Sequence, residues 1–345
     1  MENNLLINSE NLIALKKLIY DYRLKGKIDL VYIDPPFATN NVFRYDEERA
    51  NTISANLDAK IAHTDKLQGK DYLSFLKERI VLIKELMSPY ASIYLHIDYK
   101  IGHYVKVLMD EIFGIQNFRA DIARIKCNPK NFKRKNYGNV KDMILFYTKT
   151  SNYIWNEVSS PYTKEDIEKL FKKVESNGRR YTTVPLHAPG ETKNGQTSLM
   201  WKGILPPKGR HWRCAPSELD LLDKRGLIEW SSNKIPRKKI YADEFILKGK
   251  KMQDIWEFKD PQSPAYPTEK NSNMLEFIIK NSSNENSIVL DCCCGSGTTI
   301  LAAQKLNRKW IAVDESEKAI LVTKKKLSTL DSRLFEKKSK VLDLN

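Results

Sequence analysis

The chain has 345 residues, of which 41% are hydrophobic and 29% are charged, a composition typical of globular proteins. No apolar run reaches the length of a membrane helix, and the acidic, polar N-terminus lacks the pattern of a signal peptide. The five cysteines, three of them consecutive, are too few for a disulfide framework and lack the spacing of structural zinc ligands. We therefore expect a cytoplasmic protein with no membrane partner and no metal.

The net charge of +15 is concentrated in two windows of the chain. Residues 119–149 contain nine Lys or Arg against two Asp or Glu, and residues 193–251 contain fourteen against six. Localised basic charge favours a polyanionic partner such as nucleic acid. The alternative interpretation is a solvated, lysine-rich surface.

In the first 149 residues, short apolar runs alternate with segments that have the apolar spacing of amphipathic helices. The runs predict strands at residues 5–7, 28–33, 91–97, 122–125 and 143–147. The amphipathic segments predict helices at residues 12–20, 72–87 and 103–112. Polar residues 38–70 and basic residues 126–138 are predicted to form loops. Consecutive β-α-β units predict a parallel sheet.

Residues 150–258 have weak periodicity, scattered Gly and Pro, and five of the six tryptophans. We expect a separate, irregular domain here, whose basic and aromatic residues suit contact with nucleic acid. Alternatively, the tryptophans form the core of that domain. From residue 259 the α/β pattern returns. It predicts helices at residues 271–280, 298–306 and 317–327, and strands at residues 288–290 and 310–313.

The first candidate motif is Asp34-Pro35-Pro36-Phe37, directly after the predicted strand 28–33. Proline has no N–H to donate to a ladder, so the strand ends here and Asp34 lies at its carboxyl end. In α/β sheets, ligands bind outside the carboxyl ends of strands. By itself, however, a strand that ends in Asp-Pro is weak evidence for a site.

The second motif, DCCCGSGTT at residues 291–299, lies between a predicted strand and a predicted helix. Gly295 and Gly297 permit a tight turn and the close approach of a ligand. The next strand ends in Asp314, which is positioned to accept hydrogen bonds from ribose hydroxyls. Together these features indicate a nucleoside cofactor. A P-loop is excluded because no GK[ST] follows, and the third glycine of the dinucleotide fingerprint is missing.

The two motifs together resemble the DNA amino-methyltransferases, and their order resembles the circularly permuted β class. Further segments that resemble this class are SIYLHID at 92–98, DMILFYTK at 142–149 and YPTEKNSNMLEFII at 266–279. The resemblance implies a Rossmann-like α/β fold with a mostly parallel twisted sheet flanked by helices. It also implies a catalytic half at residues 1–149, a smaller irregular target-recognition domain at 150–258 and a cofactor-binding half at 259–345.

The resemblance implies a role for each matching residue. Asp34 and the Pro35 carbonyl would accept hydrogen bonds from the target amine, and Phe37 would stack on the base after it flips out of the helix; Pro36 completes the catalytic motif. The residues implied to bind S-adenosyl-L-methionine are Glu10, Thr268, Lys270, Asp291, Cys293, Gly295, Gly297, Thr298 and Asp314. From the basic windows we predict DNA contacts by Lys126, Lys130, Lys133, Arg134, Lys135, Arg210, Trp212, Arg213, Arg237, Lys238 and Lys239.

Four positions depart from the usual family pattern. Cys292 and Cys293 replace Pro and Phe, Glu269 replaces Gln, and Lys141 stands where His is common. The missing aromatic ring at residue 293 predicts weaker cofactor binding. Because Asp34 and both loop glycines are present, we expect an active enzyme.

The predicted function is N6 methylation of adenine in double-stranded DNA, within a bacterial restriction-modification system. Asp34 favours adenine, because family members that modify cytosine N4 more often begin the catalytic motif with Ser. The alternatives are cytosine-N4 methylation, an RNA substrate, which the large recognition insertion disfavours, and a DNA-binding subunit with a decayed cofactor site. The resemblance also allows for a cognate restriction endonuclease and a homodimer as partners.

Overall fold

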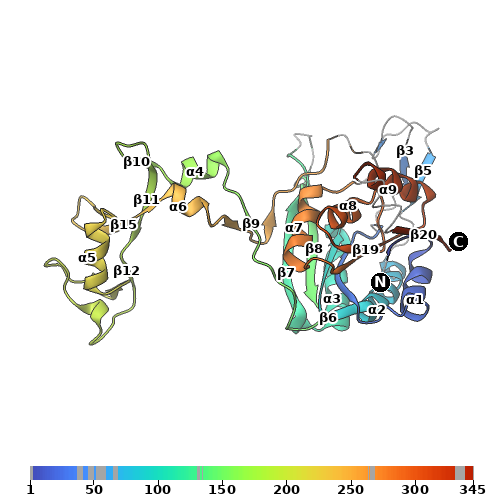
Figure 1. Cartoon of the computed structure of the whole chain (residues 1–345), viewed down its shortest axis with the longest axis horizontal. Coiled ribbons are helices and arrows are strands. Elements are labelled where there is room, and N and C mark those ends of the chain that lie inside the picture. The colour runs from blue at the N-terminus through green and yellow to red at the C-terminus, as the bar shows by residue number, and fades with distance from the viewer. Residues whose placement is uncertain are drawn as a thin grey trace. The chain divides into compact units, whose positions relative to one another are not determined.

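The computed structural model describes residues 3–36, 42–45, 50–51, 60–64, 69–129, 133, 135–262, 264, 269–330 and 339–344 (Figure 1). The chain divides into a larger unit, Met1–Val158 with Met252–Asn345, and a smaller unit, Ser159–Lys251. The smaller unit is shorter than the predicted domain 150–258, because both ends of that range bond to the larger unit. The Asn156 N–H donates to the Asn281 carbonyl at 2.7 Å, and Ile255–Trp256 pairs with a strand of the main sheet.

The larger unit contains a nine-stranded sheet in the order β17-β7-β8-β6-β2-β18-β19-β1-β20. All neighbouring strands are parallel except β8, which is antiparallel to both β6 and β7. The strands are β1 (Asn4–Asn8), β2 (Ile28–Ile33), β6 (Met87–Ile97), β7 (Phe118–Ile125), β8 (Lys141–Thr148), β17 (Ile255–Trp256), β18 (Ile288–Asp291), β19 (Lys309–Asp314) and β20 (Ser339–Asp343). The mostly parallel sheet predicted from the sequence is confirmed.

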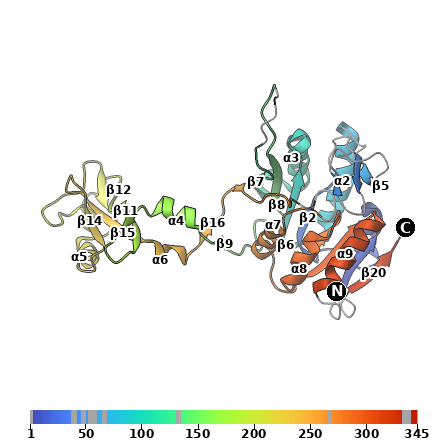
Figure 2. The same ribbon diagram turned by 90° about the horizontal axis from the view of Figure 1, so that it is seen from above.

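Helices cover both faces of this sheet (Figures 1 and 2). Alternate residues of β2 point to opposite faces, as strand geometry requires: Val31 packs in one apolar cluster, and Leu30 and Tyr32 in the other. The helices on the Val31 face are α1 (Asn11–Tyr20), α2 (Gly69–Leu86) and α3 (Tyr99–Phe113). The helices on the opposite face are α7 (Ser272–Ser282), α8 (Thr298–Lys305) and α9 (Glu317–Leu330).

Two sequence predictions of elements are corrected, and two strands were missed. The range 38–70, predicted as a loop, contains β3 (Val42–Tyr45), β4 (Ala50–Asn51) and β5 (Lys60–Thr64), which form an antiparallel sheet. β6 begins at Met87 and runs through Pro89, so this proline lies inside a strand. The strands β17 and β20 were not predicted, because short outer strands carry little apolar periodicity.

The smaller unit is built on a four-stranded antiparallel sheet in the order β10-β11-β15-β14. These strands are β10 (Lys173–Val174), β11 (Arg180–Pro185), β14 (Ile228–Trp230) and β15 (Pro236–Tyr241). Two further strand pairs are β12 (His187–Pro189) with β13 (Arg210–Trp212), and β9 (Ser159–Ser160) with β16 (Lys250–Lys251). The helices are α4 (Lys164–Leu170), α5 (Pro216–Lys224) and α6 (Ala242–Ile246).

Trp212 belongs to the core of the smaller unit, so its prediction as a DNA contact is wrong. Its side chain is 1% exposed and packs with Trp201 and Leu219, and its Nε1–H donates to the Leu199 carbonyl at 3.0 Å. A ring enclosed in this way has no face on which a base can stack. The alternative interpretation of the tryptophans, as core residues, therefore holds for Trp201 and Trp212.

Candidate active site

Asp34 follows the carboxyl end of β2, and its side chain is 17% exposed. Its Oδ2 atom lies 2.5 Å from the Nζ atom of Lys270, whose side chain is 11% exposed. Its Oδ1 atom is buried and has no hydrogen-bond partner in the part of the chain that the structure describes. A buried carboxylate oxygen with an unused acceptor position suits a ligand that donates hydrogen bonds.

The structure thus places Lys270 beside the catalytic motif, whereas the resemblance assigns it to the cofactor; that assignment stays a prediction. Pro35 is buried and Pro36 is exposed. Two other predicted residues, Phe37 and Thr268, lie outside the described residues.

The glycine-rich loop connects β18 to α8 and brings two carboxylates together. Asp291, at the end of β18, is 2% exposed and accepts a hydrogen bond from the Cys293 N–H at 3.1 Å. Asp314, at the end of the neighbouring strand β19, accepts from the Gly295 N–H at 2.8 Å and from the Ser316 N–H at 3.0 Å. Because β18 also pairs with β2, this loop and Asp34 follow adjacent strands of the sheet.

The electrostatics of these carboxylates favour a cationic ligand. Burial raises the pKa of Asp291 to about 7, and the nearby charges of Asp34 and Asp314 add to this shift, although hydrogen bonds to Asp291 oppose it. Burial also raises the pKa of Asp314. A positive ligand group would relieve this crowding of negative charge. The pair therefore fits the ammonium and ribose hydroxyl groups of S-adenosyl-L-methionine.

Gly297 precedes α8 with a left-handed backbone conformation, φ 73°. A Cβ atom at this position would lie 2.5 Å from Thr323 Oγ1, and Thr323 is fully buried. We expect Gly297→Ala to lower the melting temperature and to weaken cofactor binding, because both the strain and the clash act on the loop. Gly26→Ala is the matched control: Gly26 has φ 71°, yet its Cβ would meet no atom within 4 Å. Equal melting temperatures for the two variants would contradict this account.

Glu10 lies at the N-terminus of α1, where its carboxylate accepts from the Ile13 N–H at 3.1 Å and pairs with Arg79. The next residue, Asn11, donates to the Cys292 carbonyl at 3.3 Å and to Cys293 Sγ at 3.4 Å. This cluster therefore lies against the glycine-rich loop. Sequence reasoning missed Asn11 and Arg79, although an arginine on the apolar face of α2 was an available signal.

Thr298 begins α8, and its Oγ1 atom lies 3.0 Å from Ser296 Oγ. Together with Gly295, Gly297, Asp291 and Cys293, it forms one loop, as the resemblance implies.

The predicted DNA contacts fall into several groups. Exposed cations are Lys133, Lys135, Arg210 and Arg213. Three others bond within the chain: Lys126 to Asp142 at 2.7 Å, Lys239 to Glu175 at 2.9 Å, and Arg237 to Thr183 Oγ1 at 2.9 Å. Lys130 and Arg134 lie outside the described residues.

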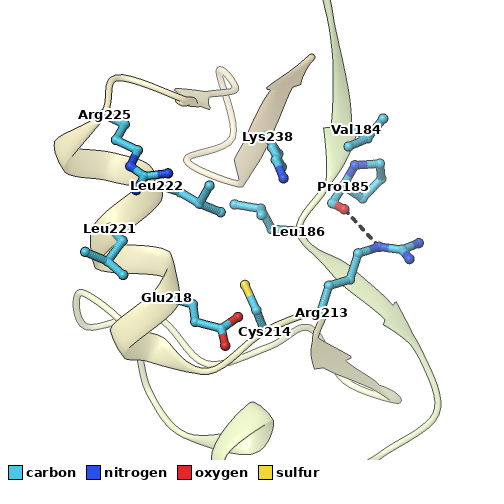
Figure 3. A pocket seen from close by; sticks show the side chains of 10 residues that line it. All are labelled: Val184, Pro185, Leu186, Arg213, Cys214, Glu218, Leu221, Leu222, Arg225 and Lys238. Carbon is cyan, nitrogen blue, oxygen red and sulfur yellow. Dashed lines mark hydrogen bonds between the residues drawn. The ribbon is translucent and has the colours of Figure 1, made fainter. Parts of the chain in front are cut away.

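Lys238 and Arg213 line a cavity of about 350 Å³ in the smaller unit, together with Arg225 (Figure 3). Its other lining residues are Val184, Pro185, Leu186, Cys214, Glu218, Leu221 and Leu222. The cavity thus combines three cationic side chains, one carboxylate and apolar walls.

Solved structures with a similar fold define the class of protein. The cytosine-N4-specific PvuII DNA methyltransferase aligns with all of this chain and 96% of its own, with a TM-score of 0.53 and 13% identity. A putative DNA modification methylase from Thermus thermophilus aligns with 99% of each chain, with a TM-score of 0.50 and 13% identity. The chain therefore has the α/β fold of DNA methyltransferases.

The sequence matches the DNA methylase family over residues 28–325, and the chain belongs to this family, which transfers methyl groups from S-adenosyl-L-methionine to adenine N6 or cytosine N4. It is 40% identical to the Type II methyltransferase M.EcaI of Enterobacter cloacae over 319 residues, covering 91% of this chain and 67% of M.EcaI. It is 26% identical to the Type III restriction-modification enzyme StyLTI Mod subunit of Salmonella typhimurium, covering 89% of this chain but only 50% of that subunit. No helix in the described part of the chain is both long and apolar enough to span a membrane.

Proposed function

We propose that this chain methylates the N6 amino group of adenine in double-stranded DNA, with S-adenosyl-L-methionine as the methyl donor. The observation that carries the proposal is the buried Oδ1 atom of Asp34, which has no hydrogen-bond partner among the residues that the structure describes. Asp34 follows β2, and β2 pairs with β18. The loop after β18 brings Asp291 and Asp314 together. An acceptor for a target amine thus lies beside a set of groups that suits the cofactor.

An exocyclic amine is a poor nucleophile, because its lone pair is delocalised into the base. Hydrogen-bond acceptors at its protons favour the pyramidal form, in which the lone pair is available. We assign this task to Asp34 Oδ1 and to the Pro35 carbonyl. The bound cofactor supplies the electrophilic methyl group, and Asp291 and Asp314 orient it through its ammonium and ribose groups.

Modified-base sequencing of DNA from cells that express the chain tests this function. N6-methyladenine at one recurrent sequence is the expected result. N4-methylcytosine instead would establish the alternative specificity, and unmodified DNA alongside measurable DNA binding would indicate a decayed subunit.

We propose that the smaller unit recognises the DNA target. Support comes from its basic window and from the cavity, where Arg213, Arg225 and Lys238 outnumber Glu218 and suit contact with phosphate groups. Because relatives are named as parts of restriction-modification systems, we further propose that the modification protects DNA from a cognate endonuclease. Cleavage of unmodified but not modified DNA in cell extracts would test this partner.

DNA binding is expected to weaken steeply as salt rises, because cations released from the phosphates drive association. Replacing exposed Arg210 or Arg213 with alanine is expected to reduce the slope of log affinity against log salt by about 1 for each. Fluorescence anisotropy at salt concentrations between about 50 and 200 mM measures this slope, because the affinity of such complexes changes strongly over that range. Lys16→Ala is the control, since Lys16 is exposed on α1, outside both basic windows. A slope that does not distinguish the Arg variants from this control would contradict the assignment.

A further inference from the structure

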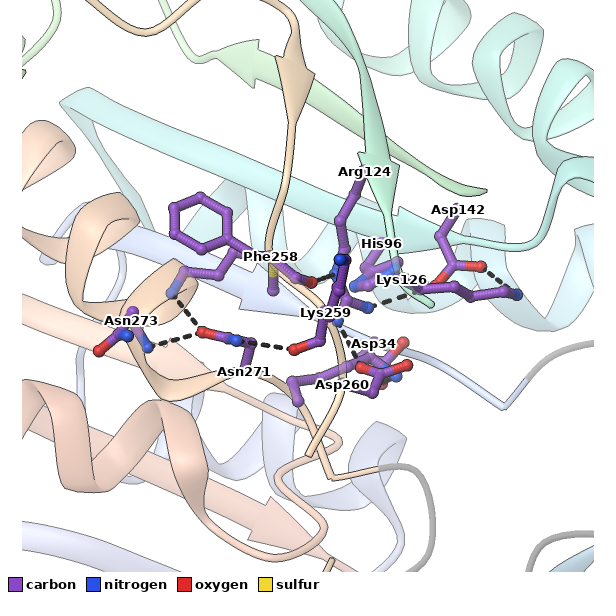
Figure 4. Close-up of polar contacts among 12 residues, drawn as sticks. Asp34, His96, Arg124, Lys126, Asp142, Phe258, Lys259, Asp260, Asn271 and Asn273 are labelled. Atoms are coloured by element: carbon purple, nitrogen blue, oxygen red, sulfur yellow. Dashed lines mark hydrogen bonds and ion pairs between the residues drawn. The ribbon is translucent and has the colours of Figure 1, made fainter. Parts of the chain in front are cut away.

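Next to the strand end that carries Asp34, three buried side chains form a polar relay, which we define as Tyr32, His96 and Asp142 (Figure 4 shows the last two). The Tyr32 hydroxyl lies 2.8 Å from His96 Nδ1, and His96 Nε2 lies 3.2 Å from Asp142 Oδ2. Their exposures are 2%, 0% and 3%. The proposed function assigns no role to any of these three residues.

The protonation states give the relay one direction. Burial lowers the pKa of His96, so its ring is neutral. Burial alone would raise the pKa of Asp142, but the hydrogen bond from His96 and the charge of Lys126 outweigh it and hold that pKa below its usual range. The Asp142 anion therefore accepts from His96 Nε2–H, which leaves Nδ1 to accept from the Tyr32 hydroxyl.

The relay crosses three neighbouring strands at the end of the sheet where the Asp34 motif begins. Tyr32 precedes Asp34 by two residues on β2, and the parallel register of β2 with β6 pairs Ile33 with Leu95. Asp34 follows Ile33 and His96 follows Leu95, so Asp34 and His96 lie at the same level of these two neighbouring strands. Asp142 lies on β8, the next strand of the sheet.

The far end of the relay is attached to the segment that leads toward Lys270 (Figure 4). Arg124 Nη1 lies 3.4 Å from Asp142 Oδ2, and its Nε donates to the Phe258 carbonyl at 2.8 Å. The next carbonyl, of Lys259, accepts from Asn271 Nδ2 at 2.7 Å. Asn271 directly follows Lys270, the ion-pair partner of Asp34. One network thus holds both the strand that carries Asp34 and the segment that carries its partner.

We propose that Tyr32 and His96 are positioning residues for methyl transfer, which set the place of the Asp34 carboxylate relative to the target amine. The inference rests on the proposed function. Small displacements of a reacting group lower rates strongly, by about 10² for roughly 1 Å. A purely structural relay would instead stabilise the sheet without affecting the rate.

The chain offers a matched control for the tyrosine. Tyr94 pairs with Tyr32 in the register of β2 with β6, is also 2% exposed, and its hydroxyl lies 2.8 Å from Ser282 Oγ. Tyr32→Phe and Tyr94→Phe each remove one buried, hydrogen-bonded hydroxyl. Only the first removes a contact of the relay.

The experiment compares single-turnover methylation, cofactor and DNA affinities, and melting temperature in the full chain. The affinities of both variants for cofactor and DNA are expected to lie within about 2-fold of those of the wild type. The melting temperatures of the two variants are expected to fall by similar amounts. Tyr32→Phe is expected to slow single-turnover methylation by about 10-fold or more, and Tyr94→Phe by less than about 2-fold. Equal rates for the two variants would overturn the inference.

Two substitutions at His96 test the inference even if the Tyr32→Phe variant does not fold. Asn places an amide near the position of Nδ1 and retains the Tyr32 contact, whereas Gln places one near Nε2 and retains the Asp142 contact. We expect His96→Asn to be faster than His96→Gln; the reverse order, or equal rates, would overturn the inference. A wild-type chain that transfers no methyl group would instead refute the proposed function, and the positioning role with it.

Discussion

Asp34→Ala is expected to reduce methyl transfer by about a thousandfold or more, while DNA and cofactor still bind. The change removes the buried Oδ1 acceptor that we assign to the target amine, but no group assigned to the cofactor or to the DNA backbone. Methylation of DNA by labelled cofactor measures the loss, and anisotropy and calorimetry measure the two affinities. Wild-type turnover in this variant would show that Asp34 is not the acceptor.

Two controls separate chemistry from stability in that experiment. Asp34→Ala removes the carboxylate that lies 2.5 Å from Lys270 Nζ, in a site where the Lys270 side chain is 11% exposed, and this loss of a nearby opposite charge destabilises the fold. The double variant Asp34→Ala with Lys270→Met removes both charges and is expected to melt higher while staying inactive. Asp29→Asn changes another carboxylate of β2, bonded to Ser88 at 2.9 Å, and is expected to retain turnover.

Cofactor affinity is expected to fall as pH drops below 7, by about tenfold per pH unit at the limit. Burial raises the pKa of Asp291 to about 7, so this carboxylate is mostly ionised above that pH and mostly protonated below it. Only the ionised form attracts the ammonium group of the cofactor. Binding near pH 6 therefore releases a proton, which calorimetry detects by comparing buffers of different ionisation enthalpy.

Asp291→Asn provides the control for this pH dependence. The amide keeps a hydrogen-bond acceptor for the Cys293 N–H, found at 3.1 Å from Asp291 Oδ1, but carries no charge at any pH. We expect weaker binding at pH 8 and no change in affinity between pH 6 and 8. If the affinity of this variant instead falls below pH 7 as it does in the wild type, the titration belongs to another group, such as Asp314.

Features encoded within a few consecutive residues were predictable from the sequence. The apolar run before Pro35 indicates where β2 ends, and the strand-glycine-helix pattern around Gly295 and Gly297 indicates the loop. The parallel sheet follows from alternating strands and helices, and these predictions are confirmed. The strands within residues 38–70, by contrast, were missed, because short strands carry little periodicity.

Contacts between distant residues were not predictable in the same way. From the sequence, Trp212 is equally compatible with stacking on a base and with a place in the core. Only its packing against Trp201 and Leu219 in the structure decides between the two. Likewise, the pairing of Lys239 with Glu175 makes an apparent DNA contact part of an internal ion pair. Burial and pairing depend on the whole chain around a residue.

The sequence by itself therefore determined the class of fold and the two motifs, including the carboxylate that we propose as catalytic, because proline, glycine and apolar spacing act locally. Only the tertiary structure showed that Asp34 pairs with Lys270, and that Tyr32, two residues before it, contacts His96 of the neighbouring strand. The physical reason is that strand order in the sheet brings β2, β6 and β18 together from distant parts of the chain. No local pattern specifies which side chains then meet.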